Sequence, residues 1–284
     1  MSNISQELLS QPECWGIAAS LAATAPLPPR GARIALAGCG SSLYMAQAIA
    51  AWREQAGDGE TDAFPASEMP IGRAYDLVVV ISRSGTTTEV VRLIDELTSP
   101  VLAITTTPGS PVTELAESIV LDFADERSVV QTRAATTVLA LWRAHLGHDV
   151  QTLAKNAQQA LTLEPPALRY RQYVFLGHGA GAALASEAAL KFRETAQTWS
   201  EAYPALEFRH GPISVITDQT LVWPIGELDA SLGNQIAQTG AALAESAGDP
   251  MVDLVRTQGA AVALAEATGL DPDHPRRLTR SVVL

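Results

Sequence analysis

Short apolar runs alternate with longer mixed stretches in the first half of the chain. Four runs are almost wholly apolar, the pattern of strands covered on both faces of a sheet, and they lie at residues 32–38, 76–82, 100–106 and 118–123. The other stretches predict helices at 5–23, 43–55, 84–97 (after an initial turn), 111–117 and 131–162. The loop at 57–70 leaves room for one short strand. Alternation of this kind predicts a parallel α/β sheet with right-handed crossovers.

The pattern restarts after Glu164-Pro165-Pro166. QYVFLGHG (172–179) repeats ARIALAGCG (32–40) as strand and Gly-x-Gly, and a helix follows from about Gly181. The two Gly-x-Gly turns begin 139 residues apart, about half the chain. Further strands are predicted at 220–225, 251–257 and 260–265. We therefore predict an internal duplication: two tandem, doubly wound, parallel-sheet (flavodoxin-like) α/β domains, residues 1–164 and 165–284.

The composition of the chain limits the kinds of molecule that it is expected to bind. Of the 284 residues, 47% are hydrophobic, enough for a substantial core. The net charge of −12 argues against nucleic acid as a partner, because binding to nucleic acid requires a basic face. It does not exclude the binding of a single small anion. The N-terminus has no signal-peptide pattern, and no apolar stretch approaches the ~20 residues of a membrane span. We expect a cytoplasmic protein with no membrane partner.

Hydroxyl side chains gather directly behind the predicted strand 76–82. Ser82, Ser84, Thr86, Thr87 and Thr88 surround a single glycine there. Hydroxyls and unpaired backbone N–H groups at a helix start suit a phosphate, although a helix N-cap uses the same residues. Gly40-Ser41-Ser42, behind the preceding strand, supplies a second turn of the same chemistry. Two such turns at neighbouring strands favour a phosphate site over simple capping.

Other cofactor sites find little support in the sequence. GCGSSLYM lacks the third glycine of a dinucleotide fingerprint, and no acidic residue closes a strand about 20 residues later. The only cysteines are Cys14 and Cys39, with no paired metal motif. His145 and His148 are close in sequence but have no evident third ligand. We expect neither a cofactor nor a metal, and a dinucleotide-dependent enzyme is the least favoured reading.

Three charged residues share one face of a predicted helix in the second domain. In SEAALKFRE, Glu187, Lys191 and Glu194 stand at i, i+4 and i+7. Taken alone, a surface Glu–Lys pair explains this spacing. A carboxylate held beside an ammonium group also suits proton transfer, and the helical pattern does not decide between these two readings.

Four segments together resemble the sugar isomerase (SIS) domain family and, within it, the isomerase half of glucosamine-6-phosphate synthase. They follow the family's order: GCGSS, SRSGTTTE, ALKFRETAQTWSEAYPALEFRHGP (189–212) and DPDHPRRLTRSVVL (271–284). The resemblance covers nearly the whole chain. It implies a tandem pair of SIS-type domains that binds a phosphorylated sugar.

The resemblance also implies roles for individual residues. Binding residues for the phosphate and sugar would be Ser41, Ser42, Ser82, Ser84 and Thr87, with Val129 and Gln131 as secondary candidates. The proton-shuttling glutamate would be Glu194 and the ring-opening histidine His210, with Lys191 steadying the carboxylate or an oxyanion. In the family this histidine commonly comes from the neighbouring subunit, so a homodimer with shared sites is implied.

Two departures from the family bear on function. A tail lysine that reacts with the open-chain sugar aligns with Arg280, and a guanidinium does not serve as an amine nucleophile. The chain starts Met-Ser-Asn, without a nucleophilic cysteine or a glutaminase half, so we expect a glutamine-independent activity.

Two functions from different classes stay open. The first is an enzyme that isomerises or deaminates a 6-phosphosugar, or an amino-sugar phosphate such as glucosamine 6-phosphate, by C1–C2 proton transfer. The second is a non-catalytic phosphosugar sensor that acts through a protein partner.

Overall fold

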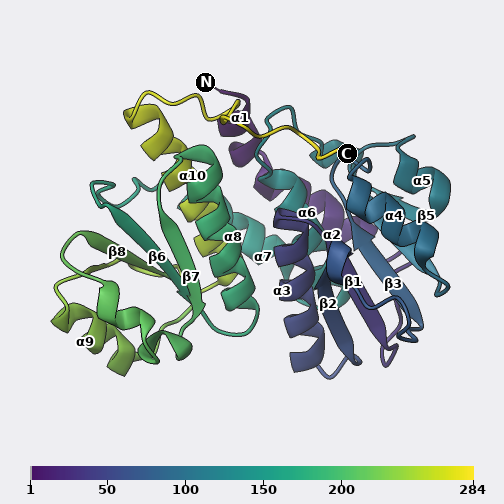
Figure 1. The fold of residues 1–284 in the computed structure, drawn as a ribbon, viewed down its shortest axis with the longest axis horizontal. Helices are drawn as coiled ribbons and strands as arrows, with labels where there is room; N and C mark the ends of the chain where they lie inside the picture. Colours follow the sequence, from purple (N-terminus) through teal and green to yellow (C-terminus); the bar gives the residue numbers. More distant parts are fainter. Residues whose placement is uncertain (1) are drawn as a thin grey trace.

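A computed structural model describes residues 2–284, which form two α/β domains side by side (Figure 1). The first domain has a five-stranded parallel sheet in the order β2-β1-β3-β4-β5. Its strands are β1 (Ile34–Gly38), β2 (Thr61–Pro65), β3 (Leu77–Ile81), β4 (Val101–Thr105) and β5 (Glu117–Val120). The central strands β1 and β3 are almost completely buried, as their apolar runs predict.

The second domain has a four-stranded parallel sheet in the order β7-β6-β8-β9. Its strands are β6 (Gln172–Gly177), β7 (Ser200–Pro204), β8 (Thr220–Ile225) and β9 (Ala242–Leu243). The order β7-β6-β8 repeats β2-β1-β3 of the first domain. The predicted fold class, two tandem domains with doubly wound parallel sheets, is confirmed.

Helices cover both sheets and fill the space between them. Those of the first domain are α1 (Asn3–Leu9), α2 (Gln11–Leu21), α3 (Ser41–Gln55), α4 (Thr88–Glu96), α5 (Pro111–Leu115), α6 (Arg133–His145) and α7 (Val150–Ala160). Those of the second are α8 (Ala180–Thr195), α9 (Ala230–Gln238) and α10 (Pro250–Ala267). Short 3₁₀ turns are η1 (Ala66–Glu68), η2 (Asp122–Ala124), η3 (Glu207–Arg209) and η4 (Pro212–Val215).

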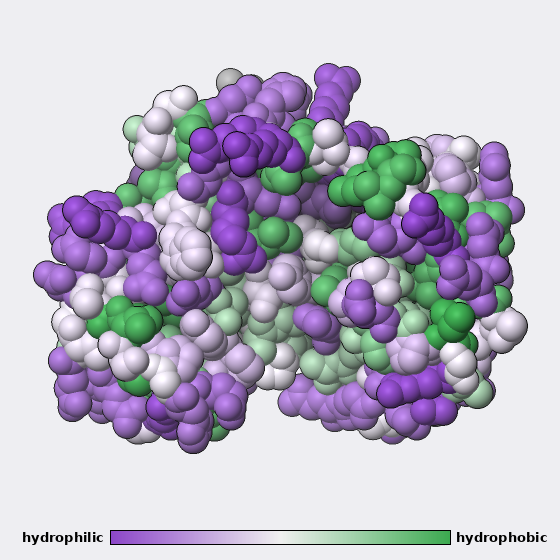
Figure 2. Space-filling model, viewed as in Figure 1, coloured by the Kyte–Doolittle hydropathy of each residue, from purple (hydrophilic) through white to green (hydrophobic). Residues whose placement is uncertain are grey.

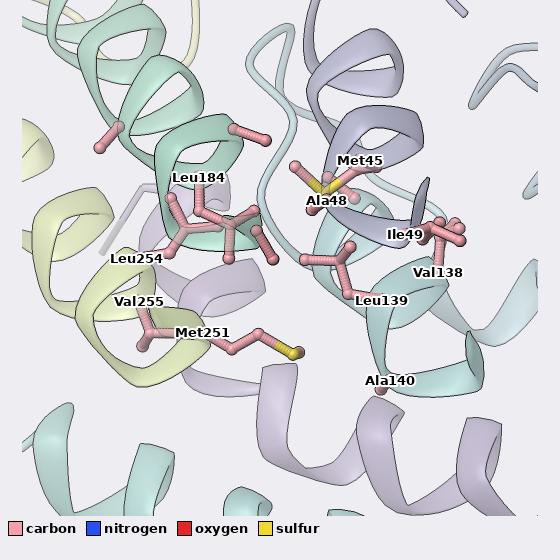
Figure 3. Packing of buried hydrophobic residues seen from close by; sticks show 14 of the residues in the cluster. Met45, Ala48, Ile49, Val138, Leu139, Ala140, Leu184, Met251, Leu254 and Val255 are labelled. Atoms are coloured by element: carbon pink, nitrogen blue, oxygen red, sulfur yellow. The ribbon is translucent and has the colours of Figure 1, made fainter. Parts of the chain in front are cut away.

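One hydrophobic core runs through both domains. Side chains from α3, α6, α8 and α10 meet in it, among them Met45, Leu139, Leu184 and Met251 (Figure 3). On the front of the molecule the division between the domains shows only as a shallow indentation at the lower edge of the space-filling view (Figure 2). Because this core is continuous, the packing of α3 against α8 fixes the first domain relative to the second.

The predicted strands at 251–257 and 260–265 are wrong, because both lie in the helix α10. This helix is buried on most of its circumference, so its apolar residues show no helical period. Asp249 caps it, since its carboxylate accepts a hydrogen bond from the backbone N–H of Met251, and Pro250 is its first residue. That Asp-Pro pair was the local signal for a helix start.

Other differences are smaller. The helix predicted at 5–23 is two helices that meet at Ser10, and the one at 131–162 is interrupted at Gly147, whose φ is 83°. The edge strand β2 lies in the 57–70 loop, where one short strand was allowed. Strands β7 and β9 were not predicted, because one is a partly exposed edge strand and the other has two residues.

The C-terminal tail returns from the second domain to the first. After α10 the chain crosses the top of the view in Figure 1 and ends beside the first sheet. On the way, the Asp273 carboxylate accepts hydrogen bonds from the backbone N–H groups of Asn3 and Ile4 at the start of α1, both 2.8 Å long. The change of sheet falls between α7 and β6, and the predicted boundary at residue 164 stays a prediction.

Candidate functional site

The hydroxyl turn lies where β3 ends and α4 begins. Ser82 and Ser84 are buried, and each accepts a hydrogen bond from a backbone N–H of the turn, that of Gly85 (3.2 Å) and that of Thr86 (3.2 Å). Gly85 has a φ of 65°, and a Cβ there would come within 2.0 Å of Ser110 Oγ. Only glycine fits this place, so the turn is held in one conformation.

The second turn lies beside the first, because β1 and β3 are neighbours in the parallel sheet. Ser41 and Ser42 are buried at the first residues of α3. Ser42 lines a small cavity together with Arg83 and Gln131. The structure thus brings both predicted turns and one residue of the 128–134 segment to a single edge of the first sheet, at the carboxyl ends of its strands.

Arg83, in the middle of the hydroxyl turn, connects three segments of the chain. Its buried guanidinium donates hydrogen bonds to the backbone carbonyls of Ser128 (3.2 Å), Val129 (2.9 Å) and Arg280 (2.8 Å). It also pairs with the buried carboxylate of Glu126 at 3.5 Å. Arg83 therefore holds the 126–131 segment and the tail against the turn, which places Val129 beside it by its backbone.

The tail covers the hydroxyl turn. Ser281 Oγ lies within hydrogen-bond distance of the hydroxyls of Ser84 (3.1 Å) and Thr86 (2.9 Å), and 3.5 Å from that of Thr87. The backbone carbonyl of Val282 accepts a hydrogen bond from the N–H of Thr88 at 3.2 Å. In this structure the hydroxyls of the turn therefore contact a hydroxyl of the C-terminal tail, that of Ser281.

Arg280 forms contacts on the first domain. Its guanidinium pairs with Asp125 at 2.5 Å and donates a hydrogen bond to the backbone carbonyl of Glu126. These contacts place the side chain beside the 125–126 loop and give it the geometry of an anchor for the tail.

Helix α8 brings charged groups to the same edge. Lys191 Nζ donates hydrogen bonds to Ser41 Oγ (2.9 Å) and to Glu194 Oε2 (2.6 Å), and lies 3.3 Å from Glu187 Oε1. Lys191 is 1% exposed and Glu187 is completely buried. The alternative of a surface Glu–Lys pair is therefore wrong for these two residues, since they lie in the contact between the domains.

Burial sets the electrostatics of this cluster. The loss of water around the carboxyl raises the pKa of Glu187 to about 7, although the Lys191 ammonium opposes the rise. The pKa of Lys191 is also raised: burial lowers it, but the carboxylates of Glu187 and Glu194 outweigh burial. Lys191 thus stays an ammonium that orients Glu194, which lines an open groove with Trp199, Arg276 and Arg277.

His210 lies apart from this cluster within one chain. It is exposed at the end of η3, beyond β7, and the residues that line the groove beside Glu194 do not include it. The structure therefore unites Ser41, Lys191 and Glu194, and leaves His210 on the open surface of the second domain.

Three residues of the site were not predicted. Arg83 and Ser281 act through contacts between segments nearly 200 residues apart, which no local pattern reveals. Glu7 of α1 is buried, and its carboxylate accepts hydrogen bonds from the backbone N–H of Arg127 (2.6 Å) and from the Ser128 hydroxyl. It shapes the 126–131 segment, and only its place on the apolar side of α1 could have hinted at this.

Neither a metal-binding cluster nor a membrane-spanning helix is found in residues 2–284. No group of three or more histidine, cysteine, aspartate or glutamate side chains is arranged to hold a metal ion in this part of the chain. Over the same residues, no helix has the length and apolar character needed to cross a membrane.

Comparison with known proteins identifies the family. The SIS domain profile matches residues 30–145 and 169–227. A glutamine–fructose-6-phosphate aminotransferase (isomerizing) of Bradyrhizobium diazoefficiens is 27% identical over 89% of this chain and 52% of its own length. The chain thus spans about half the length of curated relatives that it matches.

Solved structures share the fold over the whole chain. Glucosamine-6-phosphate deaminase from Thermotoga maritima superposes with a TM-score of 0.86 at 23% identity and covers 100% of both chains. Tagatose-6-phosphate ketose/aldose isomerase from Escherichia coli gives 0.77 at 21% identity over 98% of this chain and 95% of its own. With the family profile matched over more than half of its residues, this chain belongs to the SIS domain family.

Proposed function

We propose that the protein binds a 6-phosphosugar at the hydroxyl turn and transfers a proton between its C1 and C2 atoms. The observation that carries this proposal is Lys191, whose ammonium bridges Ser41 at the edge of the first sheet and Glu194 on α8. It places a carboxylate beside the hydroxyl turns. The names of the relatives, a glucosamine-6-phosphate deaminase and a tagatose-6-phosphate isomerase among them, support the same class of substrate.

In the proposed site the phosphate binds to Ser82, Ser84 and Thr87, with Ser41 and Ser42 nearer the sugar. Binding there displaces the Ser281 hydroxyl from Ser84 and Thr86. Gln131 and Val129 complete the wall. The phosphate supplies binding energy away from the reacting carbons and so positions C1 and C2.

Glu194 is the proposed base and acid. Its carboxylate takes a proton from one carbon and returns it to the other through an enediol or, for an amino sugar, an enolamine. Lys191 keeps that carboxylate oriented through its hydrogen bond to Oε2. His210 of a second copy would open the sugar ring, so the proposed active form is a homodimer with shared sites.

Arg280 takes no covalent part in this proposal. Its guanidinium is paired with Asp125 and is not an amine nucleophile, so the tail residue holds the tail in place and forms no imine with the sugar.

The test is a coupled assay without glutamine. Glucosamine 6-phosphate, galactosamine 6-phosphate, glucose 6-phosphate and fructose 6-phosphate with ammonia are offered, and both ammonia and ketose are measured. Ammonia release marks a deaminase, and ketose alone marks an isomerase. Glu194→Gln should lower turnover by about 10²–10⁴-fold and keep sugar binding, whereas Glu96→Gln, an exposed change on α4, should alter neither.

A phosphosugar sensor is the second candidate function. It is favoured by the contacts of Ser281, since the tail and a phosphosugar compete for the same hydroxyls and binding would release the tail. Saturable binding of a sugar phosphate with no turnover across the panel would select this candidate and overturn the enzymatic one.

A further inference from the structure

A second cavity adjoins the Glu194 groove and shares Gln197, Thr198 and Arg276 with it. It has a volume of about 470 Å³, within the range of small-molecule sites. It lies among the segment before β6, the carboxyl ends of α8 and α10, and the start of the tail. Its walls include Tyr170, Leu264 and Leu270, which give it an apolar side.

A buried hydroxyl in its wall has no acceptor. Tyr173 is 1% exposed, and its ring packs against Phe192 at 4.8 Å. Its Oη lies near the backbone of Tyr170, but its O–H donates no hydrogen bond within the described residues. Buried hydroxyl donors in folded proteins are almost always paired. Because this Oη has almost no accessible surface, a ligand oxygen reaches it when a side chain of the cavity wall moves aside.

Two arginines on the rim are also free of ion pairs. Arg169 and Arg276 line the cavity, and neither forms a salt bridge with any residue from 2 to 284. The chain has 31 acidic residues against 19 basic ones. Two unpaired guanidinium groups at one cavity of such an acidic protein form a local site for an anion.

We propose that this cavity binds a small organic phosphate, separately from the hydroxyl turn. The phosphate oxygens contact the guanidinium groups of Arg169 and Arg276, the apolar or aromatic part packs against Tyr170 and Leu264, and one ligand oxygen accepts the hydrogen bond of Tyr173 Oη. Arg276 also lines the Glu194 groove, but none of the residues that would bind this ligand has a role in the proposed function, and the proposal does not depend on that function.

Phenyl phosphate is a suitable probe, titrated calorimetrically into the full chain. The Ser82→Ala/Ser84→Ala double variant serves as background, because it removes hydroxyls of the other proposed phosphate site. In that background we expect saturable binding of one molecule per chain. Arg276→Ala and Arg169→Ala should each weaken it about tenfold, the size of a charged hydrogen bond. Tyr173→Phe should weaken it about threefold.

The matched control is Arg171→Ala, an exposed arginine of the same segment that does not line the cavity, and it should leave the affinity unchanged. Thermal unfolding checks that each variant is folded, and Arg276→Gln replaces the alanine variant if that one does not fold. No saturable binding in the double variant, or equal affinity in the Arg276, Arg169 and Arg171 variants, would overturn the proposal. An unchanged affinity in Tyr173→Phe would overturn the assigned hydrogen bond.

Discussion

The two domains share one turn and use it in opposite ways. Gly40 in the first domain and Gly179 in the second have nearly the same backbone angles, φ 57° and ψ −125° against φ 51° and ψ −123°. Ser41 follows the first and Ala180 the second. The same strand–turn–helix unit therefore presents hydroxyls in one domain and a bare apolar helix start in the other.

The next strand shows the difference more clearly. Behind β3 the hydroxyl turn is covered by the end of the chain, through Ser281. Behind β8 the backbone N–H of Gly226 donates to the buried carboxylate of Asp253 at 2.9 Å, which also accepts from Ser246 Oγ (2.6 Å) and Ala247 N (2.7 Å). The second domain thus holds a carboxyl group of its own at the edge where we propose that the first domain binds an exchangeable phosphate. Backbone N–H donors at such an edge can bind a ligand anion only where no acceptor of the chain itself already occupies them.

Removal of the Asp253 carboxyl group should have the largest effect, and the effect should be on stability. Asp253→Ala removes a buried carboxyl that accepts hydrogen bonds from Gly226, Ser246 and Ala247 and pairs with Arg256. The free energy of unfolding should therefore fall by about 3 kcal/mol or more. Urea unfolding measures it, with Asp218→Ala on the surface as control. A loss below about 1 kcal/mol would contradict the view that this carboxylate fills the second domain's edge.

The matching change in the first domain should affect binding, and it should lower stability much less than Asp253→Ala does. Ser84→Ala removes a hydroxyl from the proposed phosphate site, so affinity for the phosphosugar should fall by about tenfold or more. Calorimetric titration measures it, and Ser214→Ala, an exposed serine of the second domain, is the control. Equal affinities in the two variants would exclude the turn as the phosphate site.

The contact between the domains should give stability a pH dependence. The pKa of Glu187 is raised by burial from 4.5 to about 7, so between these values the folded chain keeps a proton that the unfolded chain has lost. The free energy of unfolding should therefore fall as the pH rises from about 5 to 7, on the order of 1–3 kcal/mol.

Glu187→Gln, which is always neutral, should flatten this slope, and Glu96→Gln should keep it. Urea unfolding at a series of pH values measures the slopes of both variants and the parent. The same slope in Glu187→Gln and the parent would show that Glu187 does not titrate in this window.

The smallest predicted effect is a gain in affinity for the phosphosugar. Ser281→Ala removes the hydroxyl that contacts Ser84 and Thr86, so these become free for phosphate, and the phosphosugar should bind about threefold more tightly. Thr279→Ala, two residues earlier, is the control for a general loosening of the tail, because the Thr279 hydroxyl donates to the backbone carbonyl of Ser281 (2.8 Å) and does not contact the turn. Weaker binding in Ser281→Ala would mean that Ser281 is itself a ligand of the sugar phosphate.

Features that depend on neighbouring residues could be predicted from the sequence, and features that depend on contacts between distant segments could not. The strands of the first sheet, the Gly-x-Gly turns and the hydroxyl turn are local patterns, and the structure shows them in place. α10 was misread because burial on most of its surface removes the helical period. Arg83 and Ser281 gain their contacts only when the tail returns across the molecule, and the raised pKa of Glu187 exists only once α8 packs against α3. The position of His210 relative to Glu194 in an assembly stays a prediction.

The most direct test of the account is a titration of glucosamine 6-phosphate into two variants that cannot turn it over, Glu194→Gln and Glu194→Gln/Ser84→Ala. If the first domain binds the phosphate and the second supplies the base, the single variant binds the sugar phosphate and the double variant binds it at least about tenfold more weakly. Glucosamine without phosphate should bind weakly and equally to both. Equal affinity of the two variants for glucosamine 6-phosphate would contradict the division of labour between the domains.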